Sequence, residues 1–301
     1  MNTFEESAPP PTQFQTQLSS LNLDVGEAPA GQESDPNNPR WGLGQAFLTW
    51  ILSIVLLFLV PLVFGLPYIF YRYQGAVPNR ETLLHDKAFL FINVASYIPV
   101  HALTFLLAWA VVTQLGKVNF RDAIGWSWPR NFGFWKSAAF ALVLFGIGLV
   151  LIVLFGGQET DIERMIQSSR PTAVTLAFLA FATAPLVEET VYRGVLYPAL
   201  QRTIGMTGAV ILVSALFAAG HVFQYWPNMG VISAIVLLSV ALTVVRARTG
   251  RLLPCFIIHL IFNGIQSIEI LLAPYIPALN SGAEHKAGFV IGLVRALDWF
   301  Y

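Results

Sequence analysis

Two adjacent carboxylates and an arginine interrupt an apolar stretch near the middle of the chain, where they could do chemistry. Glu188, Glu189 and Arg193 lie in the run 181–197. Each charge costs about 2.5–3.5 kcal/mol at the centre of a bilayer, so these side chains need partners or a wet cavity. Glu189 and Arg193 are spaced for an ion pair on one helical face. Glu188 lies about 100° around the helix from Glu189, which makes it the less neutralised carboxylate and the candidate for chemistry.

Two histidines and an asparagine interrupt later apolar runs. His221 follows a run of small residues, while His259 and Asn263 are one helical turn apart, so their side chains point the same way. A carboxylate held away from water suits a general base that activates water. A neutral imidazole can orient that water or pass on a proton. His259 and Asn263 would stabilise a developing oxyanion.

Together these residue types predict peptide-bond hydrolysis without a covalent intermediate. The chain has no Gly-x-Ser-x-Gly motif for a serine nucleophile. Its one cysteine, Cys255, follows Pro254 in an apolar run and is interpreted as a small buried hydrophobic residue.

The same residues could instead bind a metal. Glu188, His221 and His259 would form a two-histidine, one-carboxylate set with a position left open for water, as in catalytic zinc sites. The His-Glu-x-x-His helix is absent, however. Direct activation of water is therefore the preferred interpretation, no metal ligand is firmly assigned, and zinc stays open as the cofactor.

The elements that must position these residues are membrane-spanning helices. The chain has 301 residues, of which 55% are hydrophobic and 11% charged, whereas soluble domains carry roughly a quarter charged residues. This composition excludes a soluble enzyme, and the zero net charge without a basic run predicts no nucleic-acid partner. We predict an all-α polytopic membrane bundle of about eight transmembrane helices. The apolar runs are 46–71, 88–115, 137–155, 172–199, 207–226, 231–245, 252–273 and 287–301.

Charge divides the chain into two parts. Residues 1–44 hold six acids and one base and are rich in Pro, Gln, Ser and Asn, which predicts a disordered tail. Residues 45–301 form the predicted membrane domain, with a motif-bearing core at about 172–273. For eight spans, the distribution of Lys and Arg between the loops favours cytoplasmic termini in the plasma (inner) membrane.

Three motifs occur in order on successive apolar segments. They are Glu188-Glu189-x-x-x-Arg193, Phe217-x-x-x-His221 and His259-x-x-x-Asn263. This arrangement resembles the CPBP family of intramembrane proteases, which comprises CAAX proteases and bacteriocin-processing enzymes and is also called the Abi family. It includes the eukaryotic type II CAAX prenyl endopeptidase.

The resemblance implies an eight-helix membrane fold and hydrolysis of a peptide or protein substrate that is membrane-associated or lipidated. It also implies that Glu188 and His221 activate water and that His259 and Asn263 form the oxyanion side. We predict that the site lies between the fourth, fifth and seventh spans. Members of the family are described both as metalloproteases and as glutamate-dependent enzymes, and the sequence leaves that choice open.

Two interpretations from other functional classes remain. A proton-coupled transporter would also keep Glu, Arg and His inside the bilayer, but paired broken helices in two matching halves are not apparent. A non-catalytic immunity or binding protein is the second alternative, and such a protein would keep its function without Glu188.

Overall fold

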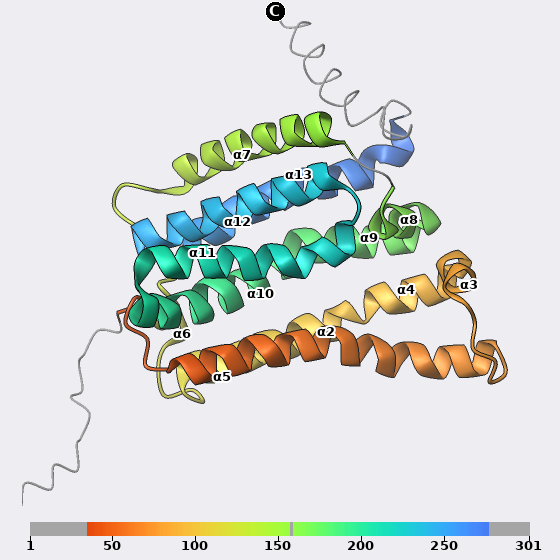
Figure 1. Ribbon diagram of the computed structural model, residues 1–301, viewed down its shortest axis with the longest axis horizontal. Coiled ribbons are helices and arrows are strands. Elements are labelled where there is room, and N and C mark those ends of the chain that lie inside the picture. Colours follow the sequence, from red (N-terminus) through yellow and green to blue (C-terminus); the bar gives the residue numbers. More distant parts are fainter. Residues whose placement is uncertain (1–34, 157–158, 277–301) are drawn as a thin grey trace, which may run out of the picture. The chain divides into compact units, whose positions relative to one another are not determined.

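The computed structural model describes residues 35–156 and 159–276, and all regular structure in these two ranges is helical (Figure 1). This confirms the predicted all-α class. The elements are α2 (Leu43–Arg72), α3 (Arg80–His85), α4 (Lys87–Ala95), α5 (Tyr97–Thr113), α6 (Phe120–Ile124), α7 (Phe134–Phe155), α8 (Asp161–Ser168), α9 (Arg170–Phe178), η1 (Leu179–Thr183), α10 (Ala184–Glu188), η2 (Glu189–Leu196), α11 (Tyr197–Tyr225), α12 (Met229–Thr249), α13 (Leu253–Leu272) and η3 (Ala273–Tyr275).

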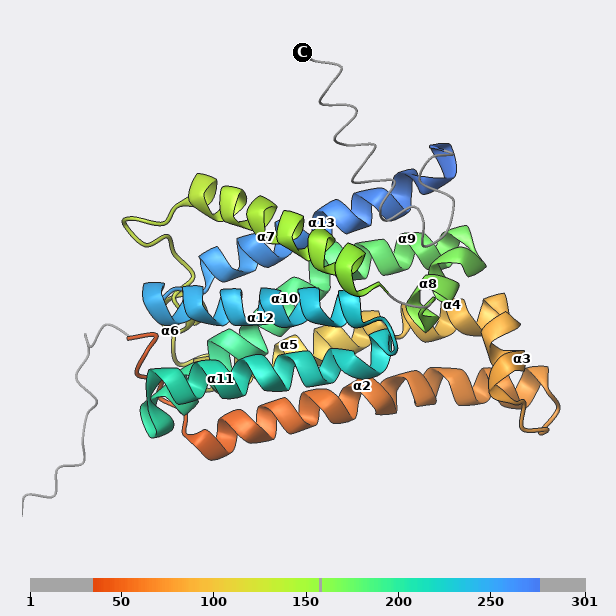
Figure 2. The same cartoon turned by 45° about the horizontal axis from the view of Figure 1, so that its top comes forward.

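Six helical runs among the described residues are long and apolar enough to cross a membrane. One of them, Arg170–Tyr225, has 56 residues and contains Gly205, whose φ of 76° and ψ of 171° are not helical. The chain reverses there, so this run holds two predicted spans (Figures 1 and 2). The last predicted span, 287–301, lies outside the described residues, and the total of eight stays a prediction.

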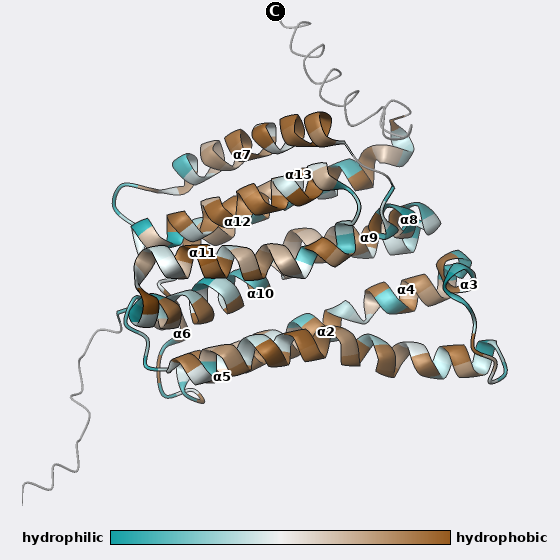
Figure 3. Ribbon diagram, in the orientation of Figure 1, coloured by the Kyte–Doolittle hydropathy of each residue, from teal (hydrophilic) through white to brown (hydrophobic). Residues whose placement is uncertain are grey.

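The helices direct large apolar side chains outward. Phe58, Leu62, Leu154 and Ile211 are all exposed, and apolar residues dominate the long helices (Figure 3). Apolar surface on this scale is stable when hydrocarbon rather than water surrounds it. The chain is an integral membrane protein.

The segment from Leu179 to Leu196 occupies the interior of the bundle. It packs against α2 and α5 as well as α11 and α13. Two of its parts, η1 and η2, are π-helical, so their turns are wider than those of an α-helix. This segment carries both glutamates and Arg193, and its burial places them away from the lipid-facing surface.

The residues just before α2 also contact the helical core. Trp41 is buried, and its indole Nε1 donates a hydrogen bond to the Val195 carbonyl at 2.9 Å. Arg202 donates to the Asn38 side chain and the Pro39 carbonyl. Of the predicted tail, residues 1–34 lie outside the described residues, whereas residues 35–44 include these core contacts.

Candidate active site

The predicted site residues lie on three neighbouring parts of the bundle. Glu188 ends α10 at its junction with η2, His221 lies near the end of α11, and His259 and Asn263 lie on α13. These are the fourth, fifth and seventh of the predicted spans. The long sequence separations between the motifs are bridged because α11 and α13 pack against the segment that carries the glutamates.

The Glu188 carboxylate faces both histidines. Its Oε1 lies 3.9 Å from His221 Nε2, and its Oε2 lies 3.7 Å from His259 Nε2. The side chains of Glu188 and His221 are 25% and 21% exposed, whereas that of His259 is 3% exposed. The structure therefore brings a partly exposed carboxylate and a partly exposed imidazole together beside a buried imidazole.

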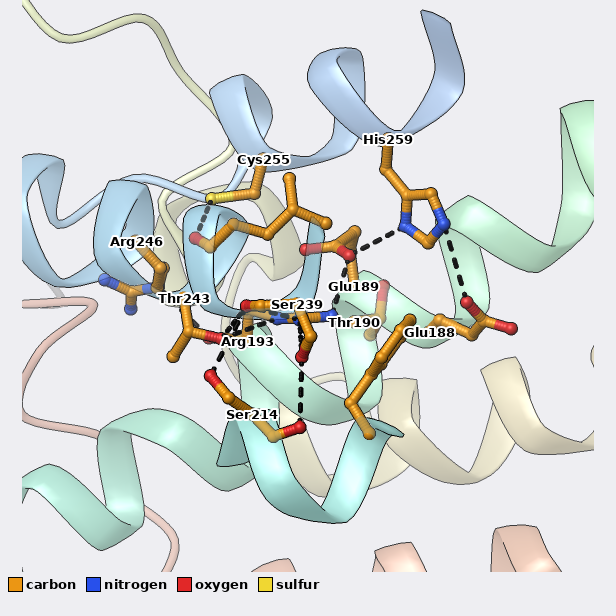
Figure 4. Close-up of polar contacts among 12 residues, drawn as sticks. Glu188, Glu189, Thr190, Arg193, Ser214, Ser239, Thr243, Arg246, Cys255 and His259 are labelled. Carbon is orange, nitrogen blue, oxygen red and sulfur yellow. Dashed lines mark hydrogen bonds and ion pairs between the residues drawn. The ribbon is translucent and has the colours of Figure 1, made fainter. Parts of the chain in front are cut away.

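Hydrogen bonds at Nδ1 orient both imidazole rings. His221 Nδ1 lies 2.8 Å from the Phe217 carbonyl oxygen, and His259 Nδ1 lies 2.9 Å from Glu189 Oε1. Both partners accept hydrogen bonds, so both Nδ1 atoms donate. Each ring consequently directs Nε2 toward Glu188, as Figure 4 shows for His259.

Glu189 and Arg193 form the ion pair that their spacing predicts. Arg193 Nη1 lies 3.0 Å from Glu189 Oε1, and both side chains are fully buried. Arg193 also donates from Nη2 to the hydroxyl and carbonyl of Ser239 and from Nε to Thr243 Oγ1 (Figure 4). A buried ion pair is stable only when such further hydrogen bonds satisfy its remaining donors.

Ser239 and Thr243 also belong to this cluster, although sequence patterns did not identify them. They lie one helical turn apart in the apolar run of α12, and Ser239 further exchanges hydrogen bonds with Ser214 of α11. Their spacing on one helical face was the available signal, although small hydroxyl side chains are common in membrane helices. Only the position of Arg193 identifies them as its partners.

Phe217 packs between the charged and the imidazole groups. Its ring stacks on His221 at a centroid distance of 4.6 Å and meets His259 edge-on at 6.0 Å. The Arg193 guanidinium carbon lies 4.4 Å from the centre of the same ring. Phe217 therefore restricts the positions of both histidines and contributes a cation–π contact to Arg193.

The side-chain amide of Asn263 forms a hydrogen bond with the backbone of η1. Its Nδ2 donates to the Ala180 carbonyl at 3.1 Å. A primary amide nitrogen carries two hydrogens, so this contact occupies only one of the two donors. The contact adds a backbone-anchoring role to the oxyanion role that the motif predicts.

A third histidine approaches the site from α5. His101 Nδ1 lies 2.7 Å from Thr183 Oγ1, and the ring is close enough to Glu188 to interact with its charge. No sequence motif connects His101 to Glu188, which lies 87 positions later.

Cys255 is buried and is not positioned as a nucleophile. Its thiol lies 3.4 Å from the Leu242 carbonyl oxygen and is directed toward it (Figure 4). This agrees with its interpretation as a small buried side chain.

The donor types at the site match those of zinc proteins. The imidazoles of His221 and His259 present Nε2 while Nδ1 donates to a carbonyl or a carboxylate, and this is how zinc-bound histidines are oriented. Among the described residues, however, no group of three or more His, Cys, Asp or Glu side chains has the geometry to hold a metal ion. The donor types thus match zinc, and Glu188, His221 and His259 are the residues that would hold it.

Comparison with known proteins supports the resemblance indicated by the three motifs. Residues 170–265 match the family model described as type II CAAX prenyl endopeptidase Rce1-like. This segment holds all six predicted site residues. The chain is therefore related over this segment to the Rce1-like family, and this relationship supports an intramembrane protease.

Two curated relatives match over longer regions. The putative membrane peptidase YdiL of Bacillus subtilis is 23% identical over 57% of this chain and 67% of its own length. An uncharacterized 24.3 kDa protein of Escherichia coli is 29% identical over 44% of this chain and 61% of its own length. No solved structure matches the chain significantly.

Loss of Arg193 should destabilise the fold. In Arg193→Met the Glu189 carboxylate stays buried without its cation, and we expect the free energy of unfolding to fall by about 3–5 kcal/mol. Unfolding in detergent and the yield of monodisperse protein would measure this effect.

The matched control is Arg80→Met. Arg80 pairs with Asp161, and their side chains are 65% and 41% exposed, so its loss should cost at most about 1 kcal/mol. Equal stability of the two variants would contradict a structural role for the buried pair.

Proposed function

We propose that this protein is an intramembrane endopeptidase that hydrolyses peptide bonds of a membrane-associated or lipidated substrate. The observation that carries the proposal is the position of the partly exposed Glu188 carboxylate beside Nε2 of His221 and His259. The relationship of residues 170–265 to the Rce1-like family supports the same reaction class.

The charges of the cluster suit this role. Glu188 and Glu189 carry two negative charges, and Arg193 balances the one on Glu189. The ring of His259 lies between the two carboxylates and contacts both of them. The proposed mechanism requires His259 to donate from Nε2 as well as from Nδ1, and His221 to keep Nε2 as an acceptor.

Hydrolysis then needs only water and groups of this chain. Glu188 removes a proton from a water oriented by His221 Nε2, and the water oxygen attacks the scissile carbonyl carbon. His259 and the second Asn263 hydrogen stabilise the oxyanion of the tetrahedral intermediate. The carbon–nitrogen bond breaks as Glu188 returns the proton to the leaving nitrogen, which yields a carboxylic acid and an amine. The acid then loses its proton to the amine or to solvent and becomes the new carboxylate.

Replacement of Glu188 tests the proposal most simply. Glu188→Gln keeps the size of the side chain but removes the base, so we expect kcat/KM to fall by roughly 100-fold or more. The assay uses purified protein in proteoliposomes with fluorophore–quencher peptides anchored by a lipidated residue.

Glu159→Gln is the control, since Glu159 is 46% exposed and pairs only with Arg164 among the described residues. It should cleave like the wild type. Full activity of a folded Glu188→Gln variant would remove Glu188 as the base. If a variant that cannot cleave peptides still performed the protein's function in cells, that result would favour a non-catalytic immunity or binding protein.

A zinc-dependent form of the same hydrolysis is the second candidate. It is favoured by the orientation of the two imidazoles, whose Nε2 atoms both face Glu188. Glu188, His221 and His259 would hold the metal, which would supply a Lewis acid and a more acidic bound water.

Metal content separates the two forms. For direct activation we expect cleavage to continue after chelation and no stoichiometric zinc by elemental analysis. About one zinc per chain, lost in His221→Ala together with activity, would establish the zinc form instead. His85→Ala is the control, because His85 makes the same contact to the carbonyl four residues earlier on an exposed helix.

We also propose that the end of the bundle that carries residues 35–42 and α6 faces the cytoplasm, in the plasma (inner) membrane. The distribution of Lys and Arg supports this orientation. The bilayer and the substrate are then the expected partners.

A further inference from the structure

The two π-helical segments that flank Glu188 share a backbone defect. At the end of η1 the Ala184 N–H donates to the Leu179 carbonyl, and at the end of η2 the Tyr197 N–H donates to the Tyr192 carbonyl. Both bonds span five residues, which is the π-helical spacing. The next bond of each ladder would have to come from residue 185 or residue 198.

Both of those residues are proline. Pro185 and Pro198 have no backbone N–H, so the carbonyls of Ala180 and Arg193 lose their π-helical partner. Their α-helical partners, the N–H groups of Ala184 and Tyr197, are already used. A buried carbonyl without a donor is costly, and such groups in native proteins are almost always satisfied from elsewhere.

A side chain from a neighbouring helix supplies the missing donor in each case. Asn263 of α13 donates to Ala180 at 3.1 Å, and Arg246 of α12 donates from Nε to Arg193 at 3.1 Å. Asn263 belongs to one of the three sequence motifs, whereas Arg246 belongs to none of them. Asn263 and Arg246 thus have the same role, because each donates to a carbonyl that a proline five residues later leaves without its backbone donor.

Arg246 is held for this role. Its side chain is fully buried, and its other guanidinium nitrogens donate to the Asn37 side chain at 2.7 Å and the Pro36 carbonyl at 2.8 Å. The three oxygens that accept hydrogen bonds from this buried cation are thus neutral, and one of them is the carbonyl of Arg193. The guanidinium carbon also lies 5.6 Å from the centre of the Tyr197 ring, and Asp35 is close enough to interact with its charge.

We propose that Arg246 is a positioning residue of the active site. By completing the backbone of η2 at Arg193, it fixes the turn that directs Arg193 onto Glu189 and, through Glu189, fixes the ring of His259 (Figure 4). The effect on catalysis rests on the proposed protease function. The effect on the backbone of η2 does not.

Rescue by a restored backbone N–H tests the proposal. Arg246→Lys keeps the cation near Asn37 but removes the Nε donor, and we expect roughly a tenfold lower kcat with KM within twofold, together with a lower unfolding temperature. Adding Pro198→Ala gives residue 198 an N–H for the Arg193 carbonyl and should recover at least a third of the wild-type kcat and most of the unfolding temperature. All variants are compared at a temperature where each is folded, on the same anchored peptides.

The matched control combines Arg246→Lys with Pro254→Ala. Pro254 lies in the first turn of α13, where a helix does not need the N–H of that residue, so no rescue is expected. Rescue by both prolines, or by neither, would overturn the proposal. If Arg246→Lys does not fold, the same comparison is made on folded yield.

The two proposals fail in different ways. A wild-type protein that cleaves none of the peptides would count against the protease, whereas the unfolding temperatures of the four proteins would still decide the role of Arg246.

Discussion

The fully buried ion pair between Glu189 and Arg193 constrains everything around it. Two charges in an apolar interior are costly unless further hydrogen bonds satisfy them. Ser239 and Thr243 of α12 supply such bonds to Arg193, whereas Glu189 Oε2 is buried without a hydrogen-bond partner among the described residues. Glu189 Oε1, the oxygen that pairs with Arg193, also accepts from His259. One ion pair therefore ties α12 and α13 to η2, and Glu188 is left as the partly exposed glutamate beside the two histidines.

The wide turns on either side of Glu188 follow from the same need for satisfied polar groups. Prolines 185 and 198 each leave one carbonyl without a backbone donor, and side chains from α13 and α12 replace it. The segment is consequently held at both ends by side chains of its neighbours as well as by its own helical hydrogen bonds. In the proposed hydrolysis this fixed placement of Glu188 would be an advantage, because catalysis depends on preorganised geometry.

Features that depend on local residue spacing could be predicted from the sequence. Features that depend on contacts between distant parts of the chain could not. The apolar runs indicated the helices, and the four-residue interval indicated the Glu189–Arg193 pair. The intrusions of His221 and His259 into apolar runs indicated a shared site. The π-helical turns were not expected, because spacing alone cannot tell a wide turn from an α-helical one. Residues 35–42 have the composition of a solvated tail, and their contacts depend on Val195 and Arg246, more than 150 positions away.

The direct test of the account is to follow oxygen from water into the product. Purified protein in proteoliposomes would cleave an anchored peptide in ¹⁸O-labelled water that also contains hydroxylamine, with the products identified by mass spectrometry. Direct attack by water activated at Glu188 predicts one ¹⁸O atom in the new carboxylate and no hydroxamate. A hydroxamate product would reveal an acyl-enzyme intermediate and would contradict direct attack of water on the peptide bond.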